Sequence, residues 1–260
     1  MSAAPDTGPL DASARGFIAE LRLAASFLTI VPFISGRALD NESVAASFGW
    51  FPLVGFAIAV ALSLEDLLLA RFFDLTVRSI LIVLSLTIVT GALHLDGLAD
   101  TADALGAGRD RERALVILRD SRIGSFGAAA IFFALALKVV ALATLAGARR
   151  YTAIFAAVGL ARWAMVAVAG RIPYLRADGA GSAILASGSE PRNLTIASLT
   201  VVAAMLPLAS RTVLGAILAA IAITLAIRAF YRRWLGGVTG DLIGACGELV
   251  EIAVLLIFAR

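Results

Sequence analysis

The stretch "GSFGAAAIFFALALKVVALATLAG" (residues 124–147) is the clearest indication of how this chain folds. Lys138 is its only charged residue, and no proline interrupts it. A helix of this length would be about 36 Å long, and the hydrocarbon core of a bilayer is about 30 Å thick. The stretch therefore predicts a helix that crosses a membrane.

Further apolar runs lie on either side of this one. Hydrophobic residues make up 60% of the chain and charged residues only 16%, which is unlike a soluble domain. We expect an all-α, polytopic integral membrane protein with about seven transmembrane helices. Besides 124–147, the predicted spans are residues 44–64, 79–93, 151–170, 194–210, 212–227 and 247–259.

The N-terminus is more polar than the rest. Residues 1–16 lack the basic and apolar parts of a cleaved signal peptide, and we expect them to form a disordered lead-in. In residues 17–33, Glu20 and Arg22 interrupt apolar residues, which predicts a helix lying in the membrane interface. Residues 17–260 then form a single transmembrane domain.

Arginines are concentrated in connections that alternating spans would place on one side of the membrane. With the N-terminus in the cytoplasm, that side receives residues 94–123, 171–192 and 231–244. Because positively charged loops favour the cytoplasm, we expect this orientation. Glycine and aspartate are frequent in the same connections, so a functional site is expected at the cytoplasmic face.

Composition also excludes several kinds of site. Cys246 is the single cysteine and His94 the single histidine, so an internal disulfide, a cysteine cluster and a multi-histidine zinc site are excluded. Cys246 is expected to be a small packing residue. The formal net charge of +3 is weak evidence for a nucleic-acid partner, and we expect none.

Three aspartates in "HLDGLADTAD" (residues 94–103) are spaced as neighbours on one helical face. Asp96, Asp100 and Asp103 stand at i, i+4 and i+7. Carboxylates at this spacing repel one another, and a bound cation removes the repulsion. Oxygen-only ligands suit Mg²⁺, which commonly takes one or two carboxylates together with substrate phosphates. Ionisable groups at membrane depth also indicate function, so we predict a Mg²⁺ site here.

Groups that bind phosphate are expected nearby. His94 is a candidate ligand or base, although capping and packing explain it equally well. "RDSRIGSFG" (residues 119–127) places Arg119 and Arg122 beside the start of an apolar helix. Guanidinium groups and free helix N–H groups both favour phosphate oxygens, which suggests a pyrophosphate site. Asp120 is either a helix cap or a participant in that site.

A second acidic helix entrance follows "GGVTGD" (residues 236–241) near the C-terminus. Gly237 would allow a ligand to approach the backbone closely. Asp241 and Glu248 are seven residues apart, so they share a helical face. Two acidic entrances favour two metals, or one metal and one base. Arg176, in "PYLRADGAG" (residues 173–181), would add a cation to the same side.

Two cations lie inside predicted spans. Arg162 is expected to have a carboxylate partner or to line a cavity, because an unpaired arginine at membrane depth is costly. Lys138 is nearer the outer end of its span, and we expect it to extend its ammonium group to the membrane surface.

Taken together, these motifs resemble the cobalamin synthase family, the adenosylcobinamide-GDP ribazoletransferases. The resemblance covers nearly the whole chain after about residue 17 and preserves the family's order. It rests on "LTIVPF" with "GWFPLVG", on "HLDGLADTADAL" with "RDSRIGSFG", on "ARW" with "PYLRADGAG", and on "GGVTGDLIGACGELVE". The histidine and acidic block, combined with the arginine and glycine block, is highly specific.

The resemblance implies a bacterial inner-membrane enzyme that requires Mg²⁺. Its substrates would be adenosylcobinamide-GDP and α-ribazole or its 5′-phosphate, and its products adenosylcobalamin or its phosphate, and GMP. Asp96, Asp100 and Asp103 would hold Mg²⁺ on the pyrophosphate, with Asp241 or Asp120 as a further ligand or the base. Phosphates or other substrate groups would contact His94, Arg119, Arg122, Arg162, Arg176, Gly237 and Glu248.

Two other classes of membrane protein share some of these features. CDP-alcohol phosphotransferases also place aspartates at a membrane face, but "LDGLADTAD" lacks their Ala-Arg and their later aspartate pair. A secondary transporter should show internal repeats and a midplane site. Neither is evident, although the intramembrane Arg162 is compatible with a transporter. The sequence leaves open whether the chain forms a homo-oligomer and how many metals act.

Overall fold

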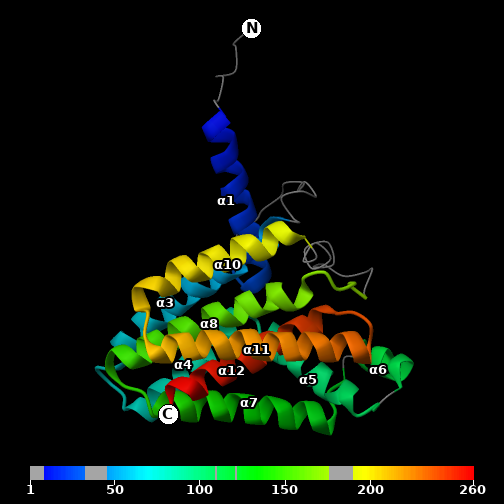
Figure 1. Cartoon of the computed structure of the whole chain (residues 1–260). Helices are drawn as coiled ribbons and strands as arrows, with labels where there is room; N and C mark the ends of the chain where they lie inside the picture. The colour runs from blue at the N-terminus through cyan, green and yellow to red at the C-terminus, as the bar shows by residue number, and fades with distance from the viewer. Residues whose placement is uncertain (1–8, 33–45, 109, 121, 176–189) are drawn as a thin grey trace.

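The computed structural model describes residues 9–32, 46–108, 110–120, 122–175 and 190–260, and most of them are helical (Figure 1). Within these residues the single β-type pairing is an isolated bridge between Tyr174 and Val238. The helices are α1 (Pro9–Leu28), η1 (Phe48–Trp50), α3 (Phe51–Leu69), α4 (Leu75–Val89), α5 (Leu93–Leu105), α6 (Arg111–Ile117), α7 (Ser125–Ala143), α8 (Gly147–Ala169), α10 (Pro191–Met205), η3 (Leu206–Leu208), α11 (Arg211–Trp234) and α12 (Gly240–Phe258).

The expected all-α membrane fold is confirmed, but not the count of seven spans. Five helical segments are long and apolar enough to cross a membrane, and a bent pair formed by α4 and α5 raises the number to six. The predicted last span corresponds to α12, which carries Asp241, Glu248 and Glu251 and is not among those segments. The qualifying segments are Phe48–Leu69, Ser125–Ala143, Gly147–Ala169, Pro191–Leu208 and Arg211–Trp234.

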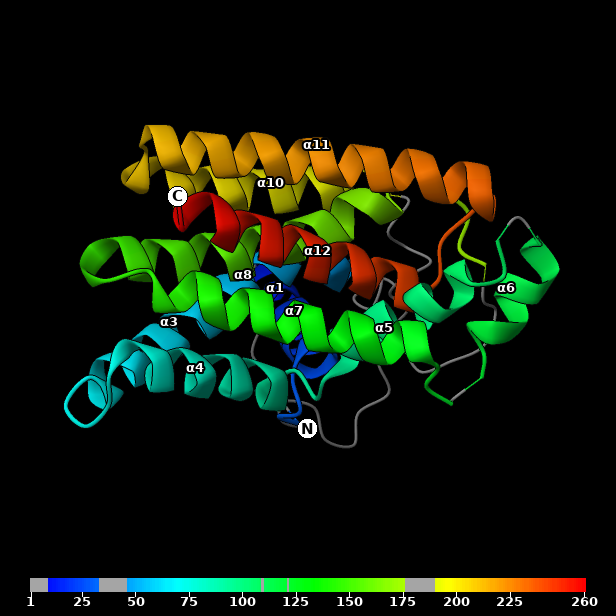
Figure 2. The same cartoon turned by 90° about the horizontal axis from the view of Figure 1, so that it is seen from below.

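Helices α8 and α12 form the centre of the bundle (Figure 2). Of the apolar window in α8, 83% is buried, compared with 28% in α7 and 22% in both α10 and α11. The outer helices expose large apolar side chains, such as Phe132 on α7, Leu199 on α10 and Leu218 on α11. So much exposed apolar surface needs a lipid environment. Polar residues of the central helices are therefore sheltered from both water and lipid.

The bend between α4 and α5 positions the acidic block. The two helix axes differ by 88°. Between them, Gly91 and Ala92 have φ angles of 59° and 57°. Glycine adopts this left-handed conformation readily, but alanine does so at a steric cost. As a result α5 leaves the direction of α4 and runs along the end of the bundle.

Helix α1 projects sideways from the bundle (Figure 1). Its described part starts at Pro9, so residues 9–16 of the segment expected to be a disordered lead-in are helical. Glu20 accepts a hydrogen bond of 2.7 Å from the indole Nε1 of Trp50, and Phe17 packs edge-on against the same ring. These contacts attach α1 to the start of α3.

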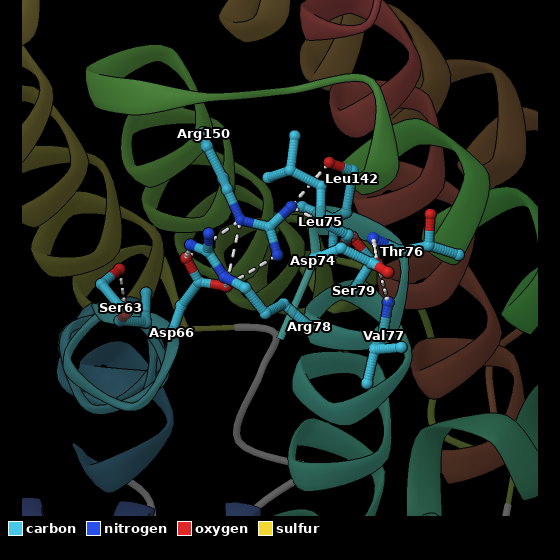
Figure 3. Close-up of polar contacts among 11 residues, drawn as sticks. Ser63, Asp66, Asp74, Leu75, Thr76, Val77, Arg78, Ser79, Leu142 and Arg150 are labelled. Atoms are coloured by element: carbon cyan, nitrogen blue, oxygen red, sulfur yellow. Dashed lines mark hydrogen bonds and ion pairs between the residues drawn. The ribbon is translucent and has the colours of Figure 1, made fainter. Parts of the chain in front are cut away.

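A buried ionic cluster joins α3, α4, α7 and α8 (Figure 3). It lies near the α3–α4 and α7–α8 turns, which are at the end of the bundle away from α5 (Figure 2). Arg150 is completely buried and donates to Asp66, to the hydroxyl of Ser79 at 3.0 Å and to the carbonyl of Leu142 at 2.6 Å. Arg78 forms a second ion pair with Asp66. Sequence reasoning missed this cluster, although a carboxylate within an apolar helix was a signal that could have revealed it.

Candidate functional site

The polar motifs of the sequence meet at one end of the bundle. That end contains α5, α6 and the first turns of α7 and α12, together with the last turns of α8 and α11 (Figure 2). The opposite end holds the α3–α4, α7–α8 and α10–α11 turns and the C-terminus. The expectation that the three motif-bearing connections share one face therefore agrees with their described parts.

Helices α5 and α12 approach each other closely at this end. A Cβ atom on Gly97 would lie 2.7 Å from the carbonyl oxygen of Asp241, and one on Gly244 would lie 3.3 Å from the Cα of His94. A side chain at Gly97 would force the two backbones apart, and one at Gly244 would require a small shift. The crossing places Asp241 beside the turn of α5 that carries Asp96 and Asp100.

Access to solvent differs among these carboxylates. Asp96 is exposed, and Asp100 and Asp241 are half-buried. The hydroxyl of Thr239, which caps α12 by accepting a hydrogen bond from the backbone N–H of Leu242, also donates to Asp241 at 3.3 Å. Of the three, Asp96 is therefore the one most accessible to a charged substrate.

Asp103 is used differently from the other two aspartates of α5. Its carboxylate accepts backbone hydrogen bonds from Gly124 at 2.7 Å and from Gly127 at 2.9 Å. These N–H groups belong to the first turn of α7, which has no side-chain cap of its own at Gly124. A Cβ atom on Gly127 would lie 2.3 Å from the Asp103 carboxylate. Asp103 thus caps α7 from a neighbouring helix.

Asp120 and Arg122 pair with each other. The Nη2 of Arg122 lies 2.7 Å from an Asp120 oxygen, and its Nε donates to the same carboxylate. Arg122, with its side chain 86% exposed, lowers the pKa of Asp120 to about 2 through these hydrogen bonds. A carboxylate with so low a pKa is a poor proton acceptor near neutral pH. Arg119 is exposed nearby, at the end of α6.

Gly237 allows a close approach, but to the protein's own chain. A Cβ atom there would lie 2.5 Å from the carbonyl oxygen of Pro173. The neighbouring Val238 donates its N–H to Pro173 and accepts from Leu175 at 2.8 Å. The start of the 173–181 motif is thereby paired with the 236–241 motif. Arg176, the cation expected from the former motif, lies outside the described residues.

A second buried ionic cluster lies inside the bundle. Lys138 on α7 lies 2.6 Å from Glu248 and 2.7 Å from Glu251 on α12, and Arg162 on α8 lies 2.6 Å from Glu251. The partner expected for Arg162 is confirmed. The expectation for Lys138 is wrong, because its side chain is only 3% exposed and its ammonium group points into the bundle. The interior carboxylates of α12 provide the attraction.

His94 is buried where α5 crosses α12, beside Gly244. It is 4% exposed, and its Nε2 has no hydrogen-bond partner among the residues that the structure describes. It is close enough to Arg162, Glu251 and Lys138 for their charges to act on it. His94, Arg162 and Glu248, predicted to contact substrate, therefore lie deeper than Asp96 and Asp241.

The acidic crossing fits one mode of Mg²⁺ binding. Among the described residues, no three histidine, cysteine, aspartate or glutamate side chains are arranged to hold a metal by themselves. Mg²⁺, however, usually takes only one or two protein carboxylates and completes its shell with water and phosphate oxygens. Carboxylates from α5 and α12, on either side of a crossing open to solvent, are suited to that shared coordination.

Comparison with known proteins assigns the chain to a family. The model of the cobalamin-5-phosphate synthase family matches residues 20–259. The adenosylcobinamide-GDP ribazoletransferase of Syntrophobacter fumaroxidans is 41% identical over 239 residues, covering 89% of this chain and 94% of the relative. That of Sinorhizobium medicae is 41% identical over 251 residues, covering 93% and 96%. No solved structure matches.

Proposed function

The chain belongs to the cobalamin-5-phosphate synthase family, and we propose that it is the transferase that joins ribazole to adenosylcobinamide-GDP. In this reaction the 3′-hydroxyl of α-ribazole, or of its 5′-phosphate, attacks the phosphorus next to cobinamide. A new P–O bond forms, the bond to GMP breaks, and the hydroxyl proton passes to a base. Neither alternative considered from the sequence is favoured by these relatives.

One structural observation supports the proposal. The crossing of α5 and α12, with its acidic residues, lies at the same end of the bundle as Arg119 and Arg122. Phosphoryl transfer requires chiefly positioning and the neutralisation of developing negative charge. Carboxylates that can share a metal with a pyrophosphate, together with guanidinium groups, are suited to both tasks.

We assign the acidic residues according to their surroundings. Asp96, Asp100 and Asp241 would hold Mg²⁺, which when bound neutralises charge on the pyrophosphate. Asp103, also expected as a ligand, serves mainly to dock α7, because both of its oxygens accept backbone hydrogen bonds.

The arginines would bind the phosphates. Arg122 would leave Asp120 and bind a phosphate oxygen instead. Its guanidinium group would then still donate to a negatively charged acceptor. Arg119 and Arg176 would add further positive charge. The exposed position of Arg122 and Asp120 keeps this exchange cheap, because surface ion pairs contribute little free energy.

We also propose that the acidic end faces the cytoplasm of a bacterial inner membrane. The arginine bias of the connections at that end supports this orientation. Phe230 stacks on Trp234 at 5.3 Å near the end of α11, as expected where that end lies in a membrane interface.

The proposed reaction has a direct assay. Purified protein in liposomes would be incubated with adenosylcobinamide-GDP and α-ribazole, with and without Mg²⁺, and GMP and adenosylcobalamin would be followed by chromatography. Equimolar, Mg²⁺-dependent appearance of both products is expected. Absence of both products with each of several ribazoles would contradict the proposal.

A further inference from the structure

Resting on the proposed function, we propose that the interior cluster of Lys138, Arg162, Glu248 and Glu251 is a positioning device for that reaction. The cluster sets α12 in the orientation that places Asp241 against Gly97, in the turn of α5 between Asp96 and Asp100. None of the four residues needs to contact substrate for this role, because they are buried and already paired.

Cations on two neighbouring helices pair with the carboxylates of α12. Lys138 comes from α7 and Arg162 from α8, and both helices pack against α12. Glu251 receives both cations, and Glu248 receives Lys138. Two carboxylates on one helix, held by cations on two different neighbours, restrain both the rotation and the axial position of that helix.

The spacing along α12 transmits this restraint to the acidic crossing. Glu248 follows Asp241 by seven residues, which is two helical turns, about 10 Å, and returns to nearly the same face. A rotation that moved Glu248 away from Lys138 would therefore turn Asp241 away from α5 by the same angle. Between these levels, Gly244 packs against His94, which belongs to the same helix as Asp96 and Asp100.

Two glycines leave room for side chains in and next to the cluster. A Cβ atom on Gly55 of α3 would lie 3.2 Å from the Cγ of Arg162, so this glycine leaves room for the arginine stem. A Cβ atom on Gly247 would lie 3.0 Å from the Cγ of Met165, which brings α12 close to α8. Small residues at such contacts are typical of tightly packed membrane helices.

The choice of charged residues is informative. Apolar residues of similar volume often stabilise a protein as well as a buried ion pair does, whereas paired charges can specify one arrangement. The cluster has two cations and two carboxylates, so it is electrically balanced. An electrically balanced cluster two helical turns along α12 from Asp241 is expected if the rotation and axial position of α12 must be fixed.

The test removes one cation and one carboxylate together. The double variant Lys138→Met, Glu248→Gln keeps the cluster balanced, retains side-chain volume and leaves the pair between Arg162 and Glu251 in place. The matched control is Asp66→Asn, Arg150→Met, which disrupts the buried cluster at the opposite end of the bundle. Both variants would be purified in detergent and compared for thermal unfolding.

Two readouts separate positioning from stability. The first is kcat and KM for adenosylcobinamide-GDP at saturating Mg²⁺. The second is the affinity for Mn²⁺, which can replace Mg²⁺ and is paramagnetic. The free Mn²⁺ concentration would be measured by electron paramagnetic resonance, with adenosylcobinamide-GDP present and ribazole omitted. In the Lys138 and Glu248 variant we expect kcat to fall about 10-fold or more with little change in KM, and Mn²⁺ to bind about 10-fold more weakly.

The outcomes are distinct. The control should unfold at lower temperature while its kcat and Mn²⁺ affinity stay within about 2-fold of the unmodified protein. Unchanged kcat and Mn²⁺ affinity in the Lys138 and Glu248 variant would overturn the positioning role. So would equal losses in the control, since both clusters would then act through stability alone. Failure of the unmodified protein to form product would instead contradict the proposed function.

Discussion

Asp100 and Asp103 are one helical turn apart on α5 and have different surroundings. Asp100 is half-buried beside the crossing with α12, whereas both oxygens of Asp103 accept hydrogen bonds from the first turn of α7. Sequence spacing predicted that the two share a face. It did not predict that Asp103 docks another helix, because that contact depends on Gly124 and Gly127 lying against its carboxylate.

Asp103→Asn is expected to destabilise the protein. The amide has one acceptor oxygen, and its NH₂ group would face a backbone N–H, so one N–H of α7 loses its partner. The free energy of unfolding should fall by about 1–3 kcal/mol, measured by thermal or denaturant unfolding in detergent. Asp110→Asn is the control, because Asp110 caps α6 locally and asparagine caps equally well.

Unfolding of Asp103→Asn at the same temperature as the unmodified protein would contradict the docking role. If that variant also required more Mg²⁺ for activity, Asp103 would belong with the metal ligands, as the sequence alone suggested.

At the scale of elements, apolar runs predicted most helices but not their interactions. α7 and α8 were anticipated because long apolar runs exceed the thickness of a bilayer. The 88° bend before α5 was not, since it requires left-handed conformations at Gly91 and Ala92 that the surrounding packing imposes. The interior position of α12 was also not evident, because its three acidic residues suggested an exposed entrance.

The crossing of α5 and α12 predicts a strong effect of a single methyl group. Gly97→Ala places a Cβ atom 2.7 Å from the Asp241 carbonyl oxygen, so the helices must separate. We expect activity to fall at least 10-fold, because displacements of about 1 Å are costly in catalysis, and stability to fall by about 1–3 kcal/mol.

Gly215→Ala on α11 is the matched control for this change. A Cβ atom there meets nothing within 4 Å, and alanine favours helix more than glycine does. Activity should therefore remain unchanged, measured as initial rates of GMP release. Wild-type rates in Gly97→Ala would show that the close crossing does not matter for the reaction.

At the scale of the whole molecule, the chain has two chemically different ends. One end gathers the acidic crossing and Arg119 and Arg122, and the other is closed by the buried cluster of Asp66, Arg78 and Arg150. Arginine counting anticipated which connections share an end. It did not reveal the closing cluster, because Asp66 and Arg150 are 84 residues apart and only folding brings them together.

The proposed orientation can be tested by labelling introduced cysteines. Cys246 is fully buried, so a membrane-impermeant maleimide should leave the unmodified protein nearly unlabelled. Glu112→Cys on α6 and Ala148→Cys at the start of α8 are both exposed and lie at opposite ends. Glu112→Cys should react only in inside-out vesicles and Ala148→Cys only in intact spheroplasts. The reverse pattern would place the acidic end outside the cytoplasm.

The central claim is that the acidic crossing acts on the substrate through Mg²⁺, and Asp100→Asn tests it most directly. Asparagine is nearly isosteric with aspartate but removes one negative charge. Rates of GMP and adenosylcobalamin formation would be measured in liposomes across a range of Mg²⁺ concentrations, after unfolding has shown that the variant is folded. We predict a loss of about 100-fold and a requirement for more Mg²⁺. An unchanged rate with an unchanged Mg²⁺ optimum would contradict the claim and remove Asp100 from the site.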